Sequence, residues 1–235
     1  MRDLLSVLST VFLVVCLSAN VFSQEEANQF VNAGDSDPAA IKILDELKAK
    51  YESFESLEMD FSIIIDLPEE DEDIIQKGKL AQSGDKFRLD MEDKSVISNG
   101  ELLWFYLKNN NEVQINDASI LEEDTDDLFS PNNLMKLYQS DDFIFVLSQE
   151  YNEGGKSFIQ IECKPIAKDN EFSKMRMTID KKKKELVSVK AFSKDGSRYT
   201  FNCEELVYDK SFDASHFNFD PAAFPDIYVE DLRIP

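Results

Sequence analysis

Alternation of apolar and polar residues, with Ile64 as the one exception in its clearest segment, is the feature that most constrains this chain. Residues 57–67 read LEMDFSIIIDL, and their odd-numbered positions are all apolar: Leu57, Met59, Phe61, Ile63, Ile65 and Leu67. Successive side chains of an extended chain point to opposite sides, so the pattern predicts a β-strand with one apolar and one polar face. Such a strand either covers an ordinary core or lines a cavity for an apolar ligand, and the alternation alone leaves both readings open.

Similar segments follow through most of the chain, separated by turn signals such as Asn99-Gly100 and Asp195-Gly196. The segments predicted as strands are 57–67, 74–82, 86–91, 101–107, 112–117, 143–149, 157–166, 174–180, 185–192 and 198–209. No linker rich in proline, glycine or serine divides them, so residues 37–235 are predicted to form one domain. We expect a mainly β fold with helices (α+β), built on a single, strongly curved antiparallel sheet of about 10–11 strands that curls toward a barrel.

Two segments carry helical periodicity instead. In the first, Asp37 can cap the helix and Pro38 suits its first turn. Its apolar positions recur every three to four residues: Ile41, Leu44, Leu47, Tyr51 and Phe54. The second, central helix is expected to begin at Ser130-Pro131 and to place Leu134, Leu137 and Tyr138 on one side. Both helices are predicted to plug or lid the apolar side of the sheet: a movable lid would leave a pocket, and a fixed one would complete a core.

The first 23 residues resemble a secretory signal peptide, with Arg2 followed by an apolar run over residues 4–22 and cleavage expected near residue 23. A retained membrane anchor, or a lipid anchor at Cys16, is the alternative. Residues 24–36 are polar and predict a flexible leader. Export would leave Cys163 and Cys203 in an oxidising compartment. They lie on predicted strands about three strand spacings apart, about 14 Å, which is too far for a disulfide, so both are expected to be free thiols.

The charge and the side-chain chemistry exclude several functions. A net charge of −22 argues against a nucleic-acid partner and against docking on anionic lipid surfaces. The one histidine, His216, is expected to be structural rather than catalytic, and no zinc site can be assembled. The acidic runs at 69–73 and 122–127 lack the spacing of a calcium loop. No enzyme activity, metal or cofactor is therefore predicted, and 18 Phe and 7 Tyr residues point to a packed interior or an apolar pocket.

Residues 78–113 resemble the central part of the periplasmic outer-membrane lipoprotein carrier protein family, LolA. The resemblance rests on the order and spacing of five short motifs: Gly78, Lys86-Phe87-Arg88, Asn99-Gly100, Leu103-Trp104-Phe105-Tyr106 and Glu112-Val113. The Ser130-Pro131 helix and a late Phe217-x-Phe219 followed by Pro221 agree with it, so that the likeness spans most of residues 38–233. One departure concerns Ser83-Gly84-Asp85, which stands where many members have a basic residue and a proline that latch the lid.

The resemblance implies an unclosed barrel in the periplasm whose helices cover a hydrophobic cavity for the acyl chains of lipoproteins. It also implies an ATP-driven release complex in the inner membrane, an acceptor at the outer membrane and a carrier that acts as a monomer. The cavity is expected to be lined by Phe61, Ile63, Ile65, Phe87, Leu89, Met91, Trp104, Leu134 and Leu137, with Ile41, Leu44, Leu47 and Tyr51 on the lid helix. An exported lipid-binding or envelope-stress sensor on the same fold is the alternative function, and a secreted hydrolase that depends on His216 ranks far behind it.

Overall fold

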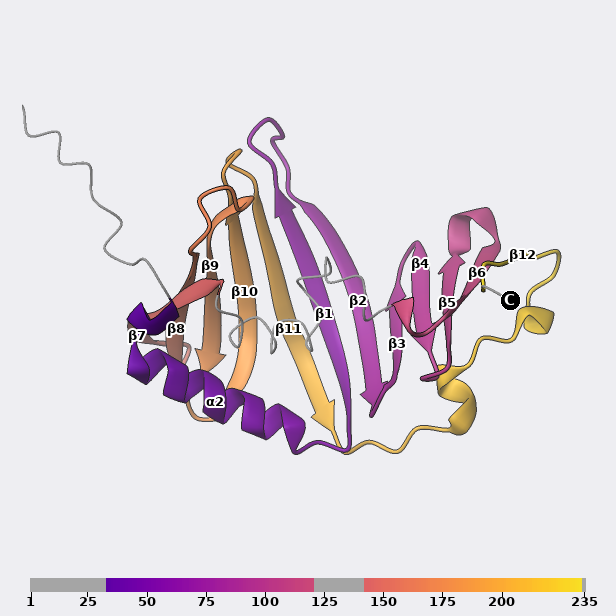
Figure 1. Ribbon diagram of the computed structural model, residues 1–235, viewed down its shortest axis with the longest axis horizontal. Coiled ribbons are helices and arrows are strands. Elements are labelled where there is room, and N and C mark those ends of the chain that lie inside the picture. The colour runs from indigo at the N-terminus through magenta and orange to yellow at the C-terminus, as the bar shows by residue number, and fades with distance from the viewer. Residues whose placement is uncertain (1–32, 121–141, 234–235) are drawn as a thin grey trace, which may run out of the picture. The chain divides into compact units, whose positions relative to one another are not determined.

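The computed structural model describes residues 33–120 and 142–233, all within one compact unit (Figure 1). The described residues form a 12-stranded sheet in the order β12-β6-β5-β4-β3-β2-β1-β11-β10-β9-β8-β7. Its strands are β1 (Ser56–Asp66), β2 (Ile74–Ser83), β3 (Lys86–Met91), β4 (Lys94–Ser98), β5 (Leu102–Leu107), β6 (Glu112–Asp117), β7 (Phe143–Glu153), β8 (Lys156–Pro165), β9 (Phe172–Asp180), β10 (Glu185–Ser193), β11 (Arg198–Tyr208) and β12 (Tyr228–Asp231).

Two antiparallel meanders make up this sheet. Strands β1 to β6 follow one another on one side, strands β7 to β11 on the other, and β11 returns to pair with β1. The last strand, β12, runs parallel to β6 at one edge, while β7 forms the other edge, so the sheet is curved but not closed. The predicted single curved sheet is confirmed, and it is antiparallel except for the pairing of β12 with β6. The short strands β4 and β12 were not among the predicted segments.

Strand register divides the side chains between an inner and an outer face. Residues paired across antiparallel strands share a face, and Met59 pairs with both Leu80 of β2 and Leu206 of β11. The same register continues from Phe201 through Val189 to Met177, on β11, β10 and β9. We call the face that carries these residues the inner face, because the helix α2 packs against it.

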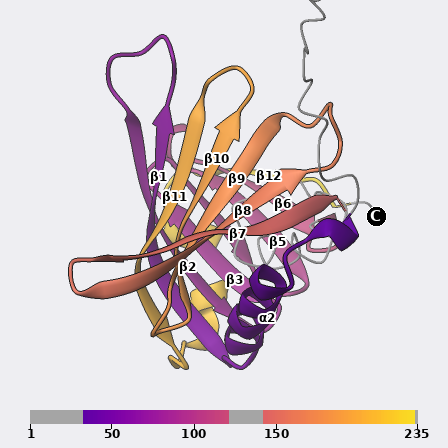
Figure 2. The same cartoon turned by 90° about the vertical axis from the view of Figure 1, so that its left-hand side faces the viewer.

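Helix α2 (Pro38–Glu52) begins as the sequence predicts, with the Asp37 carboxylate accepting a hydrogen bond from the Ala39 amide at 2.8 Å. Its Ala40, Leu44 and Leu47 side chains are almost completely buried. They belong to one cluster with residues of β7 to β10, and Ile41 and Tyr51 pack against this cluster as half-buried neighbours. Figure 2 shows α2 lying beside these strands. The packed half of the inner face, formed by α2 and β7 to β10, is therefore an ordinary hydrophobic core.

Polar contacts hold α2 at both ends. At the start, the Asp37 amide donates to the Phe145 carbonyl at 2.8 Å, and the Ser36 hydroxyl accepts from the Phe145 amide, so that the chain before the helix lies along β7. At the end, Lys50 Nζ lies 2.9 Å from Glu185 Oε1, and the Leu186 amide donates to the Tyr51 hydroxyl at 3.3 Å. These contacts fix α2 over the start of β10 as well as over β7.

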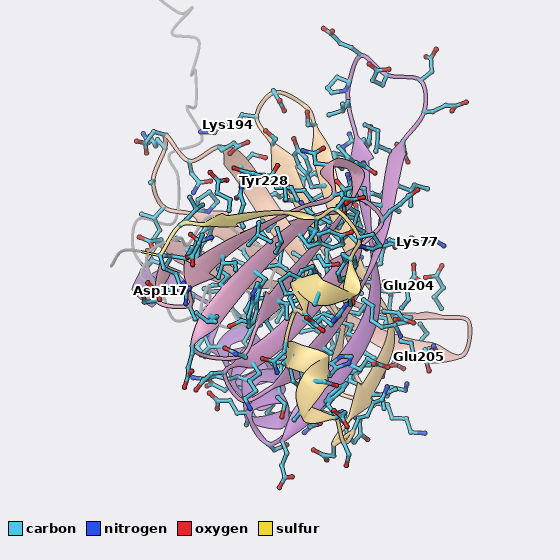
Figure 3. The ribbon with its side chains drawn as sticks, turned by 90° about the vertical axis from the view of Figure 1, so that its right-hand side faces the viewer. Lys77, Asp117, Lys194, Glu204, Glu205 and Tyr228 are labelled. Atoms are coloured by element: carbon cyan, nitrogen blue, oxygen red, sulfur yellow. The ribbon has the colours of Figure 1, made fainter. Side chains whose placement is uncertain are left out.

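A C-terminal segment of residues 209–227 covers part of the outer face. Figure 3 shows it running across the strands of the β3 to β6 side. Phe219 is buried in a cluster with Ile97, Trp104 and Val113, and Phe224 stacks on Phe219 with ring centroids 4.9 Å apart. The β3 to β6 half of the sheet is therefore covered on its outer side by a segment that has no long helix or strand of its own.

Cys163 on β8 and Cys203 on β11 are both free, as predicted, and are separated in the sheet by β9 and β10. Burial raises the pKa of each thiol to about 12. The predicted signal peptide and the expected central helix, with Leu134 and Leu137, lie outside the described residues. No helix within residues 33–120 and 142–233 is both long and apolar enough to cross a membrane.

A charge placed at Leu47 tests the packed half of the inner face. Leu47 is 1% exposed, so Leu47→Asp would bury a carboxylate without a partner and should lower the free energy of unfolding by about 3 kcal/mol or more. Ala49 lies on the exposed side of the same helix, and Ala49→Asp is the matched control, expected to have little effect. Urea titration of both variants measures the difference, and equal stability of the two would mean that α2 is not docked by this face.

Candidate functional site

The inner face of β1 and β3 carries six of the nine residues predicted to line a cavity. Register through β2 places them in adjacent rows, because Phe61 pairs with Gly78 and Gly78 pairs with Met91, while Leu80 pairs with Leu89. We call this set the inner apolar face: Phe61, Ile63, Ile65, Phe87, Leu89 and Met91. The alternation within β1 and β3 predicted these six residues. Met59, Leu80 and Phe201 lie in the same cluster but were not among the predicted cavity residues.

A close contact between Phe61 and Gly78 shapes the floor of this face. A β-carbon on Gly78 would lie 2.4 Å from Cζ of Phe61, well inside van der Waals contact. The Phe61 ring also stacks on Phe201 with centroids 5.2 Å apart. Glycine is therefore favoured at position 78, because any side chain there must displace the aromatic ring of the neighbouring strand.

Exposure distinguishes this face from the packed half under α2. Met59 and Phe61 are buried, whereas Ile63, Phe87 and Leu89 are only half-buried. In the packed half, Leu44, Ile161 and Met175 are at most 1% exposed. Four of the six residues of the inner apolar face are thus partly accessible, while Phe61 and Met91 are buried. Partly accessible apolar side chains beside a closed core suit a ligand made of hydrocarbon.

Trp104 does not lie on the inner apolar face, and its predicted placement is wrong. It pairs with Ile97 of β4 and Ile115 of β6, and it is buried on the outer face against Phe219. Leu103 is the neighbour that points inward. Strand β5 is apolar on both faces, because the C-terminal segment covers its outer side, so alternation could not assign Trp104. Leu134 and Leu137 remain untested, since they lie outside the described residues.

The turn between β2 and β3 contains no basic latch. Gly84 adopts a φ of +58°, which favours glycine, and its carbonyl accepts a hydrogen bond from the Gln82 side chain at 3.3 Å. Among the described residues, no ion pair joins this turn to α2. The nearby Arg88 points to the outer face instead, where it pairs with Asp90 at 2.6 Å and donates to the carbonyl of His216.

A hollow of about 340 Å³ is lined mainly by charged residues, together with Phe61 and Gly78. Its lining includes Asp60, Lys77, Lys79, Asp90 and Glu204. Lys79 Nζ lies 2.7 Å from a carboxylate oxygen of Asp60, so much of this charge is paired internally. No group of three or more side chains that could ligate a metal occurs among residues 33–120 and 142–233. Because its lining is mainly charged, the hollow does not suit an acyl chain.

His216 lies within the C-terminal segment, away from the inner face. Its ring stacks on Phe212 with centroids 4.8 Å apart, and its buried Nε2 has no hydrogen-bond partner within the described part of the chain. Burial and the positive charge of Arg88 lower the pKa of His216, while Glu58 and Asp90 oppose the shift. An aromatic surrounding and a missing acidic partner fit a structural residue better than a catalytic base.

Comparison with known proteins identifies the fold. The family model of outer membrane lipoprotein carrier protein LolA matches residues 52–220. An uncharacterized conserved protein from Thermus thermophilus is 11% identical, with a TM-score of 0.53 over 82% of this chain and 99% of that one. A LolA superfamily protein from Nitrosomonas europaea is 9% identical, with a TM-score of 0.39 over 77% of this chain and 97% of that one.

A third structure is a complex, MucA/MucB of Pseudomonas aeruginosa. The matched chain is 11% identical, with a TM-score of 0.38 over 76% of this chain and 61% of that one. No curated protein matches the sequence.

The contact between Phe61 and Gly78 predicts a coupled pair of substitutions. Gly78→Ala should destabilise the protein by roughly 1–3 kcal/mol, because the new methyl group displaces a buried ring. In a Phe61→Leu background the same change should cost clearly less. A double-mutant cycle by urea unfolding measures the coupling, and a cost that is unchanged in the Phe61→Leu background would refute the steric explanation.

The single histidine predicts a pH dependence of stability. The folded pKa of His216 is lowered below its unfolded value near 6.5, so the folded protein binds fewer protons and stability should fall as pH drops below about 6.5. NMR titration of the one imidazole signal, in the folded protein and in urea, measures both values. A folded pKa at or above the urea value would contradict the packing described.

Proposed function

Because the chain belongs to the outer membrane lipoprotein carrier protein (LolA) family, we propose that it carries the acyl chains of lipoproteins on its inner apolar face. The match covers residues 52–220, which include every strand that bears this face. The carrier would work in the periplasm and move lipoproteins from the inner to the outer membrane. This task requires no bond to be made or broken by the chain.

The observation that supports the proposal best is the partial exposure of Phe87, Leu89 and Ile63 beside a closed core. Covering such side chains with hydrocarbon removes apolar surface of both partners from water. Each buried methylene contributes about 0.8 kcal/mol, so one fatty acyl chain provides on the order of 10 kcal/mol before the cost of ordering it. This is enough for a stable complex and explains why a carrier of this kind has no need of charged ligand contacts.

Helix α2 would serve as a fixed plug in this mechanism. Its Leu44 and Leu47 are buried in the core, and its ends are tied to β7 and β10. Moving it away would expose the packed half of the inner face at a large cost in hydrophobic energy. We therefore expect binding to change the environment of Phe87 and Leu89 while α2 stays in place.

The partners follow from the proposal. An acyl chain leaves a membrane only if the energy of extraction is supplied from outside, so an ATP-driven release complex of the inner membrane would load the carrier. An acceptor at the outer membrane would unload it. An exported lipid-binding or envelope-stress sensor, the second candidate, would also bind an acyl chain but would hold it in a complex with a signalling protein. Transfer to an acceptor membrane separates the two functions.

Charges introduced on β3 test the proposed binding face. Phe87→Glu should leave a folded protein that takes up lipoprotein poorly, because a carboxylate would then face the acyl chain. Leu89 is the next residue of β3 on the same face, and Leu89→Glu should reduce both binding and thermal stability. Lys86 is exposed on the same strand, so Lys86→Glu is the control and should behave like the wild type.

The measurement is lipoprotein release from inner-membrane vesicles with ATP, followed by transfer to outer-membrane vesicles, alongside thermal unfolding of each variant. Normal release and transfer by both Phe87→Glu and Leu89→Glu would remove the inner apolar face from the function. Uptake by the wild type without any transfer would favour the sensor over the carrier.

A further inference from the structure

The hairpin of β1 and β2 ends in a tip that does not serve the core. Residues 67–73 connect the two strands, and Figures 1 and 2 show this connection extending past the ends of the neighbouring strands. At its base, Arg198 Nη1 lies 3.3 Å from a carboxylate oxygen of Asp66, and Pro68 lies beside Gly196 of the β10–β11 turn. The base is thus held against β11, while the tip projects.

Isoleucines line both faces of the hairpin just below the tip. Ile65 pairs with Ile74 on the inner face, and Ile64 pairs with Ile75 on the outer face. Ile74 is 46% exposed and Ile75 is 58% exposed. Leaving two isoleucines in water forgoes hydrophobic stabilisation, and polar β-formers such as threonine would maintain the hairpin equally well. Each face of the hairpin thus carries a pair of isoleucines, one of them exposed. Exposed apolar residues bordered by charge are typical of protein interaction sites.

The border of this apolar group is strongly anionic. Five consecutive residues, Glu69 to Asp73, are all exposed acids. None of the five forms an ion pair with any described residue. A surface of this kind repels anionic lipids and attracts lysine and arginine, since unpaired carboxylates favour cationic neighbours.

We infer that the tip of the β1–β2 hairpin is a docking site for a protein whose surface combines an apolar patch with lysine and arginine. This inference rests on the proposed function, because it assigns the tip to the inner-membrane protein that loads the carrier. The position of the tip supports the assignment. On the inner face, Ile65 and its partner Ile74 follow Phe61 and Ile63 along the hairpin, toward its exposed end. A partner bound there lies beside the end of the inner apolar face.

The test compares two variants of the full chain with a control. The first, Ile74→Ser with Ile75→Ser, removes the exposed apolar group. The second replaces Glu69 to Asp73 by the corresponding amides. In the control, Tyr228→Ser with Val229→Ser removes an equally exposed apolar pair from β12, at the edge of the sheet. Each protein is first required to unfold at the wild-type temperature, so that folding defects cannot explain a loss of binding.

Binding is measured by cosedimentation with inner-membrane vesicles and, separately, with protein-free vesicles made from the lipids of the same membrane. We expect wild type and control to bind the inner-membrane vesicles, both hairpin variants to bind at least about tenfold more weakly, and wild-type binding to weaken with salt. Protein-free vesicles should bind none of them. Wild-type affinity in both hairpin variants, or equal binding to protein-free vesicles, would overturn the inference.

A second measurement separates this inference from the proposed function. Binding of a soluble fluorescent fatty acid to the purified chain depends on the inner apolar face and needs no partner. Both hairpin variants should bind it like the wild type while failing to receive lipoprotein from vesicles. If the wild type does not bind the fatty acid, the proposed function fails. If it does bind and the hairpin variants still receive lipoprotein normally, the docking site fails alone.

Discussion

The pairing of β1 with β11 is the interaction on which the rest of the structure depends. It joins strands from opposite ends of the domain, matching Leu57 with Tyr208 and Asp66 with Arg198. Without it, β1 to β6 and β7 to β11 would be two separate meanders, and only the second would be covered on its inner side by α2. The stacked rings of Phe61 and Phe201 lie on this seam. Since such distant segments lose a large loop-closure entropy before they meet, we expect the seam to form late in folding.

The seam also separates two kinds of inner surface. On the β11 side, α2 covers the strands, and the buried side chains form a core. On the β1 side, the same alternation continues, but Ile63, Phe87 and Leu89 stay partly exposed. The sequence pattern is the same on both sides, because periodicity reports which face is apolar and carries no information on what lies against it. Whether such a face becomes a closed core therefore depends on the placement of one helix.

Most strands were predictable because their outer faces are polar. Strand β3, KFRLDM, was predicted with its exact bounds, since Arg88 and Asp90 alternate with apolar residues.

Strand β5 shows where this reasoning fails: the C-terminal segment buries its outer side, so Leu103 and Trp104 are both apolar and both buried. Strand β12 has four residues and a parallel partner, β6, and four residues are too few for alternation to be recognised. The role of Gly78 was equally hidden, because it depends on a ring from another strand.

The packed core and the proposed binding face thus lie on different halves of one sheet. The helix, its cap and its contacts with β7 and β10 stabilise one half without using the residues that would meet a ligand. The other half can then keep half-exposed apolar side chains, a state that would destabilise a protein lacking an independent core. The high negative charge limits the resulting risk of self-association, since molecules that expose the same apolar face repel one another. An acidic surface and an accessible apolar face are therefore complementary features: the first keeps the second available for the acyl chains that we propose it binds.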